Sequence, residues 1–141
     1  MSLDIGVGDG KSFVPLQDEP RLAFENDAYF WFLWPLFEKL QEVTGETIEL
    51  YETASFSGDA LDHLQSMLKT ARSAVADQPE AWEVCVGYQV DSSRKGAVVP
   101  LYDRPILATA HKKPFVELLD QWERVIRRAR ELGQPVVCFG D

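Results

Sequence analysis

The chain has 141 residues, a net charge of −9, 45% hydrophobic residues and 26% charged residues. These values are typical of a single globular domain spanning residues 1–141 and exclude a disordered chain. The acidic balance argues against nucleic-acid binding, because such proteins present Lys and Arg to the phosphates. The longest apolar run, residues 28–37, is about half of the roughly 20 residues that span a membrane, so we expect no membrane association.

The negative charge is concentrated in the first part of the sequence. Residues 1–62 contain 13 of the 23 acidic residues but only 3 of the 14 Lys and Arg residues. An acidic surface keeps a protein soluble and also attracts basic partners. We therefore keep two interpretations of this charge: solubility alone, or a surface for a basic protein.

The two cysteines give an expectation for the cellular compartment. Cys85 and Cys138 each lie within an apolar, strand-like run, and neither belongs to a CxxC motif or a zinc-binding spacing. Two small buried thiols are typical of a reducing compartment, so we expect a cytoplasmic protein. A disulfide between neighbouring strands stays open as the alternative.

Hydrophobic periodicity and turn residues predict three helices. The first spans Asn26–Gly45, with Asn26 or Asp27 as its N-cap, Gly45 as its end, and a kink or a restart at Pro35. The second has Ser57 as its N-cap and ends before Pro79. The third runs from Pro114, in its first turn, to Leu132.

Short strands and loops fill the rest of the chain. Before the second helix, we predict an edge strand over Ser2–Val7, a loop over Gly8–Pro20 and a strand over Thr47–Tyr51. After it, a strand over Trp82–Gln89 leads through a polar turn, Asp91–Gly96, to return strands over Ala97–Tyr102 and Ile106–Ala110, which are separated by Asp103–Pro105. A last strand spans Val136–Phe139. Strands and helices do not alternate regularly, which argues against a doubly wound fold. We predict an α+β fold, with three main helices packed on a small, mostly antiparallel sheet of four to six short strands.

The third helix carries the basic cluster of the chain, which consists of Arg124, Arg127, Arg128 and Arg130. Asp120 and Glu123 precede two of these arginines by four residues, the spacing at which acids and bases pair along a helix. We therefore predict the pairs Asp120–Arg124 and Glu123–Arg127 on a solvated helix face.

No motif in the chain predicts a catalytic site, a metal or a cofactor. Gly10-Lys11-Ser12 ends like a phosphate-binding loop, but Ile5 replaces the required first glycine and no helix follows Ser12. His63 is expected on the polar side of the second helix, near Asp59. Cys138, His111 and Asp103 could serve as nucleophile, base and orienting group, but any chain with two Cys and two His permits such a triple, and an apolar strand disfavours the thiolate of Cys138.

The most unusual feature is a run of aromatic residues in the first helix, Tyr29 to Trp34. Successive helical residues point about 100° apart, so these rings cover the whole circumference. They are either all buried in the core, or some of them anchor a partner, because large aromatics dominate binding hot spots. The candidate binding residues are Tyr29, Trp31, Phe32 and Trp34, with Glu38 and Glu42 as a polar rim.

These observations favour a binding protein over an enzyme. We expect a non-enzymatic protein-binding domain, in its sharpest form a bacterial immunity-type inhibitor that blocks a basic toxin or nuclease. One alternative is a small hydrolase or transferase that uses His63, His111, Asp103 or Cys138. The other is a homodimer in which the aromatic helix forms the self-interface.

Overall fold

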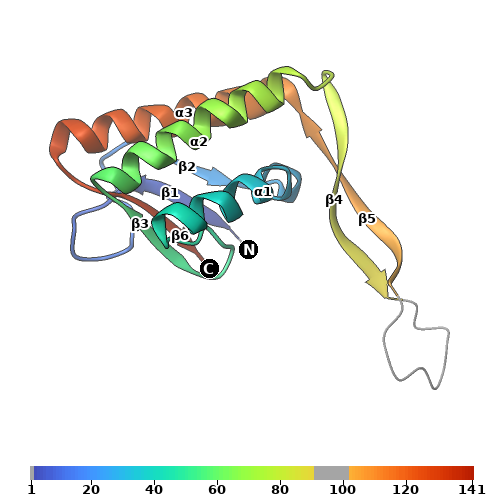
Figure 1. Cartoon of the computed structure of the whole chain (residues 1–141), viewed down its shortest axis with the longest axis horizontal. Coiled ribbons are helices and arrows are strands. Elements are labelled where there is room, and N and C mark those ends of the chain that lie inside the picture. The colour runs from blue at the N-terminus through green and yellow to red at the C-terminus, as the bar shows by residue number, and fades with distance from the viewer. Residues whose placement is uncertain (1, 91–101) are drawn as a thin grey trace.

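The fold is described by a computed structural model, which covers residues 2–90 and 102–141. It contains a four-stranded sheet of order β2-β1-β6-β3, three helices and a separate two-stranded sheet, β4-β5 (Figure 1). The α+β prediction is confirmed. The predicted turn at Asp91–Gly96 and most of the predicted strand at Ala97–Tyr102 lie outside the described residues.

The four-stranded sheet is fully antiparallel and is built from β1 (Leu3–Val7), β2 (Arg21–Phe24), β3 (Thr53–Phe56) and β6 (Val136–Gly140). The prediction of an edge strand at the start of the chain is wrong, because β1 pairs with β2 on one side and with β6 on the other. Leu3, Ile5 and Val7 are completely buried, as alternating residues of a central strand should be.

The three helices are α1 (Asp27–Thr44), α2 (Asp59–Ala76) and α3 (Lys112–Leu132). In Figure 1, α2 and α3 lie side by side and run in opposite directions. Trp122 of α3 is fully buried and meets Phe24 of β2 edge-on, with ring centroids 5.8 Å apart, and Phe37 of α1 at 6.2 Å. One indole therefore joins a strand and two helices in the core. No helix within the described residues has the length and apolar character needed to cross a membrane.

The ends of the helices agree with the sequence in part. Asn26 caps α1, since its side chain accepts a 2.8 Å hydrogen bond from the backbone N–H of Ala28, and Gly45 ends the helix with a left-handed φ of 76°. Pro35 lies inside this single helix and does not divide it. The expected N-cap Ser57 is wrong by one residue, because Gly58 holds that position.

One predicted strand is absent, and one strand of the sheet was not predicted. Residues 47–51 form no strand, and β3 begins two residues later, at Thr53. The strand β2 was not predicted, because only Leu22 and Phe24 carry its alternation over four residues. Such short segments give too few periods to be distinguished from a loop.

The strands β4 (Ala81–Val90) and β5 (Tyr102–His111) form a two-stranded arm that extends away from the rest of the molecule (Figure 1). The predicted interruption at Asp103–Pro105 is wrong, because β5 continues through Pro105, which lies opposite Tyr88. In a two-stranded sheet, each strand has one edge whose backbone groups are not paired with another strand. A proline whose nitrogen faces this edge removes no hydrogen bond of the sheet. The base of the arm is tied down by Lys112, whose Nζ donates to the carbonyls of Ala76 (2.9 Å) and Gln78 (2.8 Å).

The acids of α3 pair with a neighbouring helix and not along their own. Arg72 of α2 donates to Asp120 (2.5 Å) and to Glu123 (2.7 Å). The predicted i,i+4 pairs to Arg124 and Arg127 are therefore wrong. A guanidinium between two carboxylates stabilises the contact between α2 and α3 better than two separate exposed pairs would.

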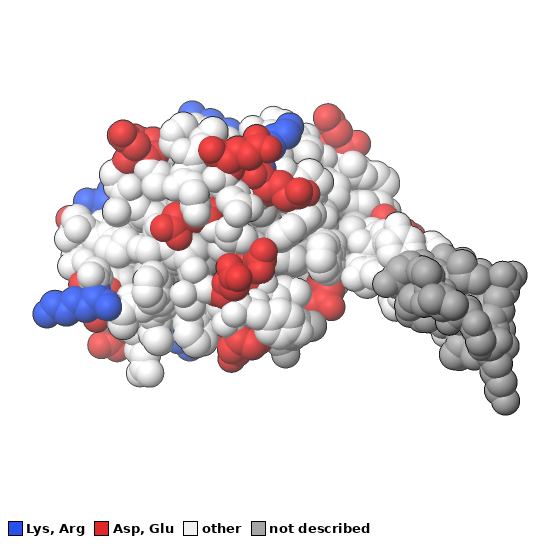
Figure 2. All heavy atoms as spheres, turned by 60° about the horizontal axis from the view of Figure 1, so that its bottom comes forward, with Lys and Arg blue, Asp and Glu red and all other residues white. Residues whose placement is uncertain are grey.

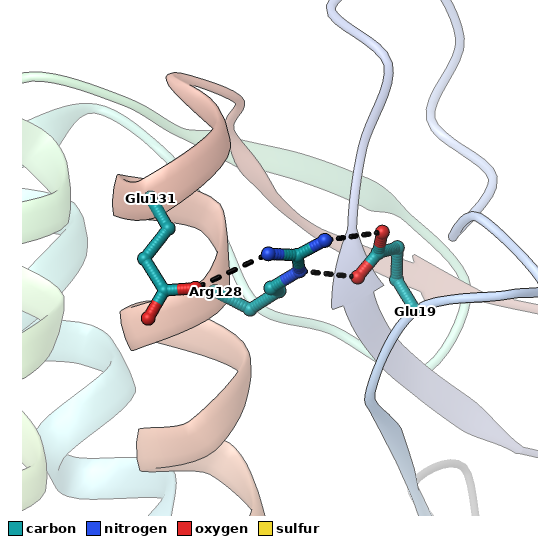
Figure 3. Close-up of polar contacts among 3 residues, drawn as sticks. All are labelled: Glu19, Arg128 and Glu131. Atoms are coloured by element: carbon teal, nitrogen blue, oxygen red, sulfur yellow. Dashed lines mark hydrogen bonds and ion pairs between the residues drawn. The ribbon is translucent and has the colours of Figure 1, made fainter.

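Arg128 of α3 connects the helix to the loop between β1 and β2. Its Nε lies 2.7 Å from one carboxylate oxygen of Glu19, its Nη2 lies 3.3 Å from the other, and Nη1 donates to Glu131 at 3.2 Å (Figure 3). Hydrogen bonds from Arg128, opposed in part by desolvation, lower the pKa of Glu19 below its ordinary value near 4.5. The pair holds this loop against the body of the protein.

We expect the Glu19–Arg128 pair to stabilise the fold only when Glu19 is ionised. A carboxyl with a lowered folded pKa adds stability above its unfolded pKa, and this stability disappears as the pH falls through the folded pKa. Wild type should therefore be more stable than Glu19→Gln at pH 7, and the difference should vanish at a pH well below 4.5. Urea unfolding from pH 7 to pH 3 measures this, with Asp18→Asn as the control for an exposed carboxylate in the same loop. A difference that does not change with pH would contradict the assignment.

Candidate functional site

The aromatic run of α1 divides between two sides of the helix. At about 100° per residue, Trp31, Trp34, Glu38 and Glu42 fall within an arc of about 80°, while Phe32 and Tyr29 point elsewhere. The six predicted binding residues thus form two groups with different surroundings.

Tyr29 and Phe32 pack against the base of the arm and the start of α3. The ring of Tyr29 lies 4.6 Å from that of Phe115, and the ring of Phe32 lies 5.2 Å from that of Trp82. Trp82 and Phe115 stack on each other with an angle of 10° between their planes. For these two residues the structure supports the core interpretation, because their rings hold β4, α1 and α3 together.

Trp31 and Trp34 lie on the other side and border an open hollow. Their ring centroids are 5.6 Å apart, and both contact Phe30, which is 2% exposed, at 5.2 and 5.7 Å. Glu49, Leu50 and Tyr51 form the opposite wall of this hollow, which has a volume of about 260 Å³. We call it the Trp31–Trp34 hollow.

The opposite wall depends on a close approach between backbones. A Cβ atom on Gly140 of β6 would lie 2.5 Å from the carbonyl oxygens of both Glu49 and Leu50. Only glycine therefore lets residues 49 and 50 lie against the end of the sheet. Ile48, which is 1% exposed, and Glu46, whose carboxylate accepts a 3.2 Å hydrogen bond from the Ser55 N–H, fix the same segment.

The residues of this wall were missed by the sequence analysis. The predicted strand over Thr47–Tyr51 does not indicate that Glu49, Leu50 and Tyr51 lie together beside α1. Tyr51 is 71% exposed, which is unusual for a large aromatic side chain. The sequence feature that could have indicated this wall is Tyr51 between the acids Glu49 and Glu52 in a short segment before β3.

The surroundings of the hollow are acidic. Between residues 22 and 68 the chain has nine acidic residues and one basic residue, Lys39. Glu38 and Glu42 are exposed on the same side of α1 as the two tryptophans. Figure 2 shows a face of the molecule on which Asp and Glu side chains clearly outnumber Lys and Arg. A positively charged partner is attracted to such a surface.

The candidate catalytic residues do not come together. Asp103 and His111 are eight residues apart on the continuous strand β5, about 26 Å at the rise of an extended chain. Cys138 is fully buried in β6, where burial and the charge of Glu46 raise the pKa of its thiol. His63 is exposed on α2 and borders a shallow groove with Leu36 and Lys39. Within the described residues, no three His, Cys, Asp or Glu side chains are grouped to hold a metal ion.

A second hollow, of about 490 Å³, lies between the start of α2 and the end of α3. Its one charged lining residue is Arg130, which already lies 2.6 Å from Asp62 and 2.9 Å from Gln65. This guanidinium is therefore neutralised within the fold, and the hollow has no free charge to offer an anion.

Comparison with known proteins gives no further guide to this site: no family model, curated protein or solved structure matches the chain.

We expect the two cysteines to differ sharply in reactivity. Cys85 is exposed on the arm, whereas Cys138 is buried and its pKa is raised. Because the thiolate is the reactive form, iodoacetamide should modify one thiol per native chain, at Cys85, and two in urea. Mass spectrometry of digested protein locates the modification. Rapid labelling of Cys138 in the native state would mean that β6 is accessible and would restore it as a candidate nucleophile.

Proposed function

We propose that the chain is a non-enzymatic protein-binding domain that holds a basic partner protein against the outer side of α1. The observation that carries this proposal is the position of the Trp31–Trp34 hollow on the same side of the helix as Glu38 and Glu42. Aromatic anchors surrounded by polar residues are the usual arrangement of an interface hot spot.

The dimensions of the hollow favour a protein partner over a small molecule. Pockets for cofactors and drug-sized ligands have volumes of about 300 to 1,000 Å³ and enclose most of the ligand. The Trp31–Trp34 hollow has about 260 Å³ and is open to solvent at Tyr51. It suits one side chain projecting from a larger surface.

The charge distribution favours a basic partner. The acids on and beside α1 attract positive charge over roughly a Debye length, about 8 Å at physiological salt. Such attraction accelerates association, while the buried aromatic contacts slow dissociation. In its sharper form, the proposal is an immunity-type inhibitor, which covers the active site of a basic toxin or nuclease.

The proposal is tested with two variants of equal charge. Glu38→Lys/Glu42→Lys reverses the acids of α1, and Glu80→Lys/Glu117→Lys reverses two exposed acids elsewhere. Affinity capture from the source cell, followed by reconstitution with the purified partner, should recover a basic protein. Its association rate should fall about tenfold or more with the first variant and much less with the second. Trp34→Ala should mainly increase the dissociation rate.

Two results would contradict the proposal. One is the recovery of no basic protein under native conditions at low salt. The other is a basic partner that binds the α1 variant and Trp34→Ala as tightly as it binds wild type. An immunity role further requires that the purified domain inhibit the activity of that partner.

A homodimer is a second candidate function, and the arm is the observation that favours it. Tyr88, Ile106 and Leu107 are 58%, 48% and 51% exposed on β4 and β5, far from the hydrophobic core. Ile106 and Leu107 are consecutive in β5, so apolar side chains are exposed on both faces of the ribbon, and exposed apolar side chains mark an interaction surface. Their position moves the expected self-interface from the aromatic helix to the arm.

We expect Leu107→Lys to separate such a dimer, because a charged side chain would be buried at the interface. Sedimentation equilibrium of wild type and of this variant measures the mass directly. A dimeric wild type and a monomeric variant support the candidate, with Glu80→Lys as a control that stays dimeric. A monomeric wild type at concentrations near 100 μM, where stable dimers with Kd of about 1 μM persist, would dismiss it.

A further inference from the structure

The Trp31–Trp34 hollow combines aromatic walls with a single carboxylate. Its aromatic lining consists of Phe30, Trp31, Trp34 and Tyr51, and its one charged lining residue is Glu49. The face of an aromatic ring carries partial negative charge and attracts cations, most strongly in tryptophan. The hollow is therefore apolar in shape but attractive to positive charge.

The carboxylate of Glu49 is not used by the fold. Among residues 2–90 and 102–141, no side chain forms an ion pair or a hydrogen bond with it, although Glu49 is half-buried. The neighbouring Glu46, by contrast, accepts a hydrogen bond from Ser55. A half-buried carboxylate without a partner gains more from an arriving cation than an exposed one does, because water screens it less.

We propose that the hollow binds an arginine side chain of the partner protein, a proposal that rests on the protein-binding function above. The guanidinium stacks on the indoles of Trp31 and Trp34 and donates hydrogen bonds to Glu49. Its aliphatic stem covers Leu50 and Tyr51. Charge complementarity supports this occupant, since Glu49 lines the hollow and Glu38 and Glu42 are exposed on the same side of α1 as the two tryptophans.

Arginine suits the hollow better than lysine does. The guanidinium is planar, so it stacks on an aromatic face while its N–H groups still reach a carboxylate at the edge. An ammonium is more strongly hydrated and loses more when it enters an apolar hollow. A wholly apolar side chain would leave Glu49 half-buried and without a partner.

The experiment observes the four indoles separately. The ¹⁵N-labelled chain is titrated with three blocked tripeptides, acetyl-Gly-X-Gly-amide, in which X is arginine, citrulline or leucine. Citrulline keeps the shape of arginine without its charge. We expect the arginine peptide to shift the indole N–H signals of Trp31 and Trp34 with a dissociation constant in the millimolar range. The signals of Trp82 and Trp122, both buried nitrogens, are the internal reference.

Matched variants assign the charge contact. Glu49→Gln should weaken binding of the arginine peptide by about two- to fivefold, while Glu52→Gln, an exposed acid that does not line the hollow, should have almost no effect. Trp34→Leu should abolish the shift of Trp31, and its folding is checked by the unchanged signals of Trp82 and Trp122. Glu49→Gln removes the charge and keeps the size of the side chain, so this variant still tests the charge contact if Trp34→Leu does not fold.

Three results would overturn the proposal: equal shifts with arginine and citrulline, stronger shifts with leucine, or shifts of Trp31 and Trp34 that Glu49→Gln leaves unchanged. None of them affects the test of the proposed function, which measures a whole partner and the acids Glu38 and Glu42. If the chain binds a basic protein but not the arginine peptide, the proposed function is supported and the proposal of an arginine in the hollow is contradicted.

Discussion

The burial of Trp122 is the constraint on which the other elements depend. Its indole touches Phe24 of β2 and Phe37 of α1, so α3, the sheet and the first helix share one contact. The Nε1 atom is buried and has no hydrogen-bond partner in the described residues, a loss typically of about 1–3 kcal/mol that the contacts of a large ring outweigh. The contact between Phe37 and Trp122 fixes the rotation of α1 about its axis. The side of α1 that carries Trp31 and Trp34 therefore faces away from Trp122.

This outer side of α1 carries Trp31 and Trp34, which line the proposed binding hollow. Phe30 lies beneath Trp31 and Trp34 and supports both, while Gly140 allows residues 49 and 50 to approach from the sheet. The hollow is thus held by a packed helix and by a backbone contact, and not by a free loop. A site fixed in this way loses little conformational entropy on binding, which is a principal cost of association.

The sequence predicted the long helices well and the small details poorly. Hydrophobic periodicity, the cap residues Asn26 and Gly45, and Pro79 are local signals, so the limits of α1 and the approximate end of α2 follow from the sequence. The central place of β1 depends on its pairing with β6, whose residues lie 129 to 137 positions later in the chain, and no local pattern reveals this pairing. For the same reason Glu49 and Tyr51 were missed: only the packing of Gly140 against residues 49 and 50 places them beside α1. Asp120 and Glu123 of α3 pair with Arg72 of α2, and Arg128 pairs with Glu19 of the loop, because the fold brings these side chains together from separate segments, which no spacing along one helix reveals.

The arm has a stability profile of its own. At its base, Trp82 is packed on Phe32 and Phe115, and Lys112 joins two carbonyls at the end of α2. Farther out, around Tyr88 and Pro105, β4 and β5 form a ladder that is interrupted where Cys85 and Gly87 flank a bulge. A two-stranded ribbon is marginal in water, so the outer amides should exchange with solvent through local opening, without global unfolding. Because the packed contacts of the arm lie at its base, a binding partner that changes the shape of the outer ribbon leaves the contacts of the core in place.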